Sequence, residues 1–147
     1  LISSLTANFR YINQEIDYKW YDSYIHNRNN TVRCAIVNSN DEILGTAGLK
    51  NVDYLNQKAD FFIMIGLKAN RGKGIGYFAT REILKHAFYN LNLNRIELIV
   101  LESNKNAINL YKKVGFIEEG KKRKCIFKNG KFVNVIIMSI LNEEFIY

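Results

Sequence analysis

The sequence predicts a single α/β domain whose mixed central sheet is flanked by helices. Short apolar runs rich in β-branched and aromatic residues, typical of strands, recur along the 147 residues. Some of these runs are joined by short polar turns, as in antiparallel hairpins, and others by helical patterns, as in parallel crossovers. The length suits one domain, spanning 1–147, with a hydrophobic core of its own, and no repeat or linker divides it.

The first half of the chain predicts one helix followed by three strands. Apolar side chains recur at helical spacing over residues 13–25. Strand-like runs at 32–37 and 43–49 are joined by a polar turn, which predicts a hairpin. The polar segment 51–58 then leads to a continuous apolar run at 61–65, as expected of a buried strand.

The second half predicts two helices, each of which returns the chain to the sheet. The first begins near Gly76, and its apolar side chains form one stripe: Thr80, Ile83, Leu84, Ala87, Phe88 and Leu91. A buried strand at 96–101 and a short helix at 105–113 follow. Gly115 comes directly after this helix and suits a left-handed C-cap.

Strand-like runs close the chain. They lie at 116–118, 123–127 and 132–141. Asn129-Gly130, between the last two runs, is the strongest hairpin signal in the sequence, because a type I′ turn needs positive φ at both central residues. Hairpins together with crossover helices predict a sheet that is part antiparallel and part parallel.

The stretch between the strand at 61–65 and its following helix carries the features of a phosphate-binding turn. Gly72, Gly74 and Gly76 lead directly into the helical pattern. Backbone N–H groups at a helix start have no intrahelical acceptor, the helix dipole favours anions there, and glycine lets a pyrophosphate approach the backbone closely. Arg71 and Lys73 add positive charge at the same place.

Two well-known phosphate loops do not fit this turn. The P-loop needs four residues between its first glycine and Gly-Lys-Ser/Thr, but five separate Gly66 from Gly72, and Lys73 is followed by glycine. The dinucleotide fingerprint G-x-G-x-x-G also fails, because the glycines alternate strictly. What remains is Arg71-x-x-Gly74-x-Gly76.

This pattern resembles the Q/R-x-x-G-x-G/A signature of the GNAT superfamily of N-acetyltransferases. A second motif of that family, N-x-x-A-x-x-x-Y-x-x-x-G-F, is matched about 30 residues later. Its positions are occupied by Asn104, Ala107, Tyr111, Gly115 and Phe116. The resemblance extends over residues 31–141 and is strongest to the subgroup of ribosomal-protein and spermidine acetyltransferases. It implies a GNAT fold, with the family's first strand and first helix expected before Leu1.

The resemblance implies acetyl-CoA as cosubstrate and no metal. The backbone of Ile63, Met64 and Ile65 is then expected to pair with the pantetheine amides, and Asn104 to contact the pantetheine arm. The pyrophosphate and its neighbourhood are assigned to the turn and to one lysine: Arg71, Gly72, Lys73, Gly74, Ile75, Gly76 and Lys113.

The resemblance also implies two catalytic residues for a direct transfer without a covalent enzyme intermediate. Tyr111 is expected to act as general acid toward the departing sulfur, the alternative being an aromatic side chain that only packs in the core. Asp60, at the start of the cofactor strand, is the candidate base, acting directly or through water; the alternative is a solvated carboxylate. Glu102 is a weaker candidate for the base.

The charge and composition of the sequence limit the kinds of partner expected for this protein. The net charge of +7 is concentrated at Lys121-Lys122-Arg123-Lys124, but no helix-turn-helix, zinc-ligand or RNA-reading aromatic motif accompanies it, so nucleic acid is not an expected partner. No apolar run approaches the ~20 residues of a membrane span. Cys34 and Cys125 are expected to be reduced, buried thiols of a cytoplasmic protein. A homodimer remains an open alternative.

The acceptor is expected to carry a primary amine, and three classes of acceptor stay open: a protein N-terminus, a polyamine and an amino sugar on a nucleotide. A polyamine site needs clustered carboxylates, of which residues 1–20 offer Glu15 and Asp17, and the basic excess opposes a polycation. An anionic nucleotide sugar suits the charge better. The alternative outside enzymes is an acyl-CoA-binding module without turnover, against which Tyr111 argues.

Overall fold

The computed structural model describes residues 14–26, 30–66 and 71–147. The elements in chain order are α1 (Gln14–His26), β1 (Val32–Val37), β2 (Ile43–Asp53), β3 (Lys58–Ile65), α2 (Ile75–Lys85), the π-helical turn η2 (His86–Asn90), β4 (Arg95–Leu101), α3 (Lys105–Val114), β5 (Ile117–Lys128), β6 (Lys131–Leu141) and the 3₁₀ turn η3 (Asn142–Glu144).

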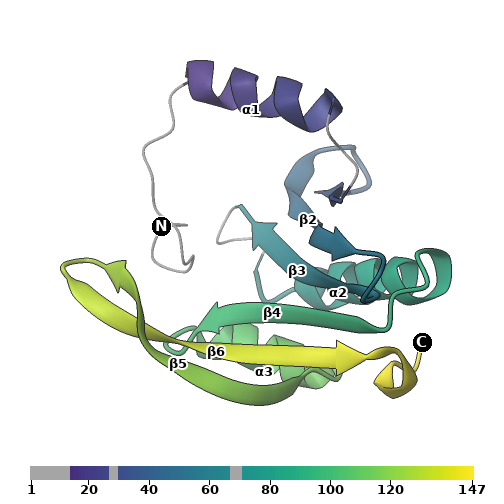
Figure 1. The fold of residues 1–147 in the computed structure, drawn as a ribbon. Coiled ribbons are helices and arrows are strands. Elements are labelled where there is room, and N and C mark those ends of the chain that lie inside the picture. Colours follow the sequence, from purple (N-terminus) through teal and green to yellow (C-terminus); the bar gives the residue numbers. More distant parts are fainter. Residues whose placement is uncertain (1–13, 27–29, 67–70) are drawn as a thin grey trace.

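The described strands form one six-stranded sheet in the order β1-β2-β3-β4-β6-β5. The β3–β4 pair is parallel and is connected through α2, whereas the other neighbours in the sheet are antiparallel. The predicted mixed sheet is therefore confirmed, and Figure 1 shows the parallel pair at its centre.

The two faces of β3 meet different helices, because successive side chains of a strand point to opposite faces. Phe61 is buried and packs edge-on against Tyr111 of α3, with ring centroids 6.2 Å apart. Phe62, on the other face, lies 4.5 Å from the guanidinium carbon of Arg33, which also lies over Trp20 of α1. The helices α2 and α3 thus cover one face, and α1 lies over the other (Figure 1).

The hydrophobic core lies between the sheet and α2 and α3. Gly76 permits this packing, since a Cβ there would come within 3.1 Å of Leu110 of α3 and 3.5 Å of Ile65. The largest fully buried apolar side chains of this core come from three strands, α2 and the loop before β4: Leu49, Leu84, Leu93, Ile96, Met138 and Ile140.

Local turn signals predicted the connections correctly. Asn129 and Gly130 have φ values of 49° and 76°, as a type I′ hairpin turn requires. Gly115 caps α3 in the left-handed region with φ of 117°. The two strand-like runs predicted at 116–118 and 123–127 are in fact one strand, β5, whose pairing with β6 shifts register twice. The bulges bring polar residues between the runs into the strand, so its alternation is lost from the sequence.

The prediction of buried cysteines was wrong. Cys34 and Cys125 are both free and exposed. They lie on β1 and β5, the outermost strands at opposite edges of the sheet, where side chains have fewer neighbours. Strands so far apart exclude a disulfide between these two cysteines within one chain.

Candidate active site

The parallel strands β3 and β4 separate after three paired positions, and we call this opening the fork. The pairs are Lys58↔Arg95, Ala59↔Ile96 and Asp60↔Glu97. The opposite edge of β3 stays paired with β2 as far as Ile65. Within the described chain, the backbone groups of residues 61–65 that face β4 therefore have no strand partner, and they offer an edge to which an extended ligand can hydrogen-bond.

The turn at the end of β3 presents open backbone to the same region. Gly72 and Gly74 have φ values of 78° and 80°, and a Cβ added at either would meet nothing within 4 Å. Gly74 is the N-cap of α2 and has no side-chain cap. The first intrahelical bond runs from Phe78 N to Gly74 O at 3.0 Å, which leaves the N–H groups of residues 74–77 without an intrahelical acceptor. These features suit a phosphate group.

The basic residues near the turn have different roles. Arg71 donates from Nη2 to the carbonyls of Ile65 and Gly66, each at 3.1 Å, and so fixes the end of β3 rather than leaving its charge free. Lys73 is exposed on the turn. Lys113, in the last turn of α3, places its ammonium 5.1 Å from the ring centroid of Tyr77 in the first turn of α2. Lys73 and Lys113 therefore place positive charge near the start of α2.

Tyr111 both packs in the core and carries a proton. It is 8% exposed, and its ring lies 5.7 Å from that of Phe116. Burial raises the pKa of the Tyr111 hydroxyl to about 12, because the ionised form would lose its hydration. No described residue hydrogen-bonds to this hydroxyl in the structure. Tyr111 is therefore a neutral donor at every physiological pH.

Asn104 lies where β4 passes into α3. It is the N-cap of α3, and its Oδ1 accepts a hydrogen bond from the N–H of Ala107 at 3.3 Å. The capping bond fixes the orientation of the side chain at this end of the fork. The sequence motif that contains Asn104 thus has a local structural function as well.

Asp60 lies at the base of the fork, as the last residue of β3 that pairs with β4. Its Oδ2 accepts a hydrogen bond of 2.7 Å from Asn51 Nδ2. Because it precedes Phe61, its side chain leaves the face opposite Tyr111. Its partner in β4 is Glu97, so two carboxylates stand side by side where the strands part.

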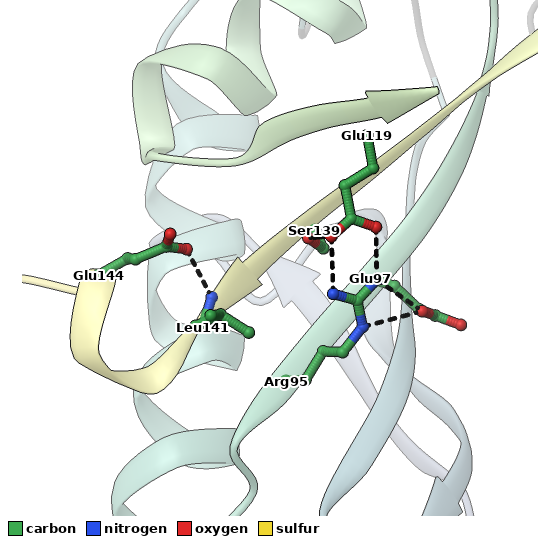
Figure 2. A network of polar contacts seen from close by, with 6 residues as sticks. All are labelled: Arg95, Glu97, Glu119, Ser139, Leu141 and Glu144. Atoms are coloured by element: carbon green, nitrogen blue, oxygen red, sulfur yellow. Dashed lines mark hydrogen bonds and ion pairs between the residues drawn. The ribbon is translucent and has the colours of Figure 1, made fainter. Parts of the chain in front are cut away.

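A network of polar contacts that includes Glu97, the strand partner of Asp60, ties β4 to β5 and β6 (Figure 2). Arg95 Nη2 lies 2.6 Å from Glu119 Oε2 and 3.1 Å from Glu97 Oε2. Ser139 Oγ donates to Glu119 Oε1 at 2.7 Å. The hydrogen bonds from Arg95 and Ser139 lower the pKa of Glu119 to about 2, and those from Glu119 and Glu97 raise the pKa of Arg95. This network fixes β4 to β5 and β6 on the side away from the fork.

Both carboxylate oxygens of Glu102 contact residues of β5 and β6. Its Oε1 pairs with the ammonium of Lys121, and its Oε2 accepts 2.7 Å from Asn134 Nδ2. These two contacts lower the pKa of the Glu102 carboxyl, which makes it a poorer proton acceptor. Together with the start of α3 and the β5–β6 hairpin it lines an open groove.

The comparisons with known proteins identify the family to which this fold belongs. Residues 7–117 match the family model of the acetyltransferase (GNAT) domain. The chain belongs to the GNAT family of acetyltransferases.

Two relatives are similar in sequence to most of this chain. Spermidine N(1)-acetyltransferase of Escherichia coli K12 is 32% identical over 126 residues, which are 86% of this chain and 66% of that protein. The putative ribosomal N-acetyltransferase YdaF of Bacillus subtilis is 33% identical over 102 residues, 69% of this chain and 55% of that protein. The chain thus spans between about half and two thirds of the length of these relatives.

A solved structure agrees over nearly the whole chain. The crystal structure of spermidine N-acetyltransferase from Vibrio cholerae in complex with CoA and spermine superposes with a TM-score of 0.91 at 29% identity. The match covers 97% of this chain and 83% of that one. Both the predicted GNAT fold and the predicted subgroup are confirmed.

Several residues of the site were not anticipated from the sequence. Glu97 and Tyr77 were missed because their neighbours, Asp60 and Lys113, are distant in the chain. Strand alternation could have placed Glu97 on the same face as Arg95, but not beside Asp60.

Among the described residues, no group of three or more His, Cys, Asp or Glu side chains is placed to hold a metal ion. None of the described helices combines the length and the apolar composition that a membrane span requires.

Proposed function

We propose that this protein is an acetyl-CoA-dependent N-acetyltransferase that transfers the acetyl group directly to a primary amine. The observation that carries the proposal is the fork, whose unpaired β3 edge ends at a turn with free N–H groups. An extended chain with a pyrophosphate at one end fits these two features together. The family of the chain and the CoA complex of its structural relative support the same ligand.

The residues that would hold acetyl-CoA follow from this geometry. The backbone of Ile63, Met64 and Ile65 would pair with the pantetheine amides along the free edge. The N–H groups of Gly74, Ile75 and Gly76 would bind the pyrophosphate, with Gly72 and Gly74 giving it room and Lys73 and Lys113 balancing its charge. Arg71 would act by fixing the turn, and Asn104 would contact the pantetheine arm from the start of α3.

The chain's own residues then handle protons on both sides of the fork. When bound, the thioester supplies an activated acetyl group. Asp60 would accept, directly or through water, the proton that the ammonium must lose before its nitrogen forms the new C–N bond. Tyr111, held neutral by burial, would donate to the sulfur as the C–S bond breaks, and would recover its proton from solvent. Glu102 is less suited to the role of base because both its oxygens are engaged.

A polyamine is the acceptor that the relatives' names suggest. A local observation favours it too, since Asp60 and Glu97 are adjacent carboxylates at the base of the fork and could bind an ammonium group. The excess of positive charge elsewhere opposes a polycation. A protein N-terminus and a nucleotide amino sugar remain the other candidates.

An acceptor screen tests this proposal. Purified protein is mixed with acetyl-CoA and one amine from each class: spermidine, a peptide with a free N-terminus, and a nucleotide amino sugar. We expect release of free CoA together with an acetylated product, detected by mass spectrometry, for at least one class. CoA binding without product in any class would instead favour the non-catalytic acyl-CoA-binding module.

The free thiols agree with a reducing, cytoplasmic setting, and a homodimer is compatible with the proposal.

A further inference from the structure

Two buried side-chain atoms in the described chain have no hydrogen-bond partner, and both lie on the face of the sheet that carries Asp60. They are Arg33 Nε and Thr46 Oγ1. Buried polar groups in native proteins are nearly always paired, because an unpaired one loses its hydration without compensation. Two such atoms on one face call for a common explanation.

The register of the strands brings the two residues together. Arg33 of β1 pairs with Gly48 of β2, and Thr46 lies two residues before Gly48 on the same face. Arg33 and Thr46 are therefore diagonal neighbours, ~7–8 Å apart in the backbone. Gly48 itself is approached so closely by β1 that an added Cβ would collide with the carbonyl oxygen of Val32.

The aromatic surroundings of Arg33 stabilise its charge but give its Nε no hydrogen-bond acceptor. Its guanidinium carbon lies 4.5 Å from the ring centroid of Phe62, 5.0 Å from that of Trp20 and 6.0 Å from that of Tyr24. Aromatic faces attract a cation, yet they accept no hydrogen bond in the guanidinium plane. No described carboxylate pairs with Arg33 in the structure. An oxyanion in the guanidinium plane would supply the missing acceptor.

We propose that Arg33 Nε and Thr46 Oγ1 together bind an oxyanion, a carboxylate or a phosphate, carried by the acceptor amine. This inference rests on the proposed function and narrows its substrate class. Phe62, which touches Arg33, lies two residues from Asp60 on one face of β3, so the anion lies about 7–10 Å from the amine. The acceptor is then zwitterionic, with its ammonium at Asp60 and its anion at Arg33, which weighs against a polyamine although Asp60 and Glu97 could bind one ammonium group.

Binding of matched probes tests the oxyanion site. Calorimetry compares 6-aminohexanoate with 6-aminohexanamide, and glucosamine 6-phosphate with glucosamine, on the free protein and on protein saturated with CoA. We expect the anionic member of at least one pair to bind about ten-fold to a hundred-fold more tightly in both states. The pair that shows the preference identifies carboxylate or phosphate. Equal binding within both pairs overturns the inference, as does a preference that disappears when CoA fills the turn.

Variants separate this site from the proposed function. Arg33→Gln and Thr46→Val should each lose the preference for the anionic probe, whereas Thr46→Ser, which keeps the hydroxyl, should retain it. Thr46→Val should leave the melting temperature unchanged or higher, since it removes an unpaired buried hydroxyl. A preference that survives both Arg33→Gln and Thr46→Val contradicts the inference. Failure to bind CoA would count against the proposed function, while the probe titrations of the free protein would still decide on the oxyanion site.

Discussion

The two edges of β4 are hydrogen-bonded very differently. Toward β6 every residue from Arg95 to Leu101 has a partner, whereas toward β3 pairing ends after Glu97. The paired edge is reinforced by the contacts of Arg95, Glu119 and Ser139 (Figure 2). The unpaired edge faces the free edge of β3 and the glycine turn. The cross-strand contacts of β4 are thus made on its β6 side. On its β3 side, unpaired backbone groups remain to which a ligand could bind.

The largest effect on ligand binding is expected when a side chain blocks the glycine turn. Gly74→Glu should abolish binding of acetyl-CoA in a folded protein, because the new side chain would occupy the space in front of the turn and its charge would repel a pyrophosphate. Calorimetry gives the affinity. Gly130→Glu is the matched control, since Gly130 has nearly the same φ, 76° against 80°, and equally open space, but lies in the paired β5–β6 hairpin. Near-normal affinity of Gly74→Glu would contradict the account.

The next effect concerns Tyr111, the proposed proton donor. Tyr111→Phe should lower the rate of transfer by about 10²–10⁴-fold, the usual contribution of general acid catalysis, while acetyl-CoA affinity stays nearly intact. The ring would still pack against Phe61 and Phe116, so the melting temperature should change little. Turnover at the wild-type rate under saturating acetyl-CoA would show that Tyr111 only packs, and Asp60 or water would be the proton source.

Tyr111 also predicts a loss of stability in alkali. Its pKa is raised to about 12 in the folded protein from an ordinary value of 10, so the unfolded chain releases this proton first. The contribution is fully present below pH 10 and is lost as the pH rises toward 12. Melting curves of the wild type and Tyr111→Phe should therefore converge or cross in the variant's favour between pH 10 and 12. A constant difference across this window would contradict the assigned cause.

The smallest effect is expected on the paired side. Glu119→Gln should lower the melting temperature by about 2–4 °C near neutral pH, because a charge-assisted contact with Arg95 is lost. The pKa of Glu119 is lowered to about 2, so its contribution is present above the ordinary value of 4.5 and is lost as the pH falls through 2. The deficit should accordingly shrink between pH 4.5 and 2. Glu118→Gln, which breaks an exposed pair with Lys112, is the control and should have almost no effect.

The sequence predicted those features that depend on a few neighbouring residues. The cap at Gly115 and the hairpin at Asn129-Gly130 follow from local sterics, and both are confirmed. The family motifs further placed Tyr111 and Asn104 on one helix. The predicted burial of Cys34 and Cys125 was wrong, because burial depends on the surroundings of a side chain. The residues of a strand do not by themselves show whether that strand lies at an edge of the sheet.

The remaining features depend on distant pairings. The point at which β3 and β4 part is set by how each strand pairs with its other neighbour, and that information lies in β2 and β6. The adjacency of Asp60 and Glu97 arises from the same register. Arg33 and Thr46 come together only through the β1–β2 hairpin, and their lack of partners appears only once the face above them is assembled.

Amide hydrogen exchange with and without CoA tests the central claim most directly, because it reports on the backbone groups themselves. Within β3, the amides of residues 61–65 that face β4, together with those of residues 74–77 at the turn, should become protected when CoA is added. Amides of β4 that face β6 are already paired and should not change. CoA binding that left both 61–65 and 74–77 unprotected would contradict the claim that the unpaired edge and the glycine turn form the cofactor site.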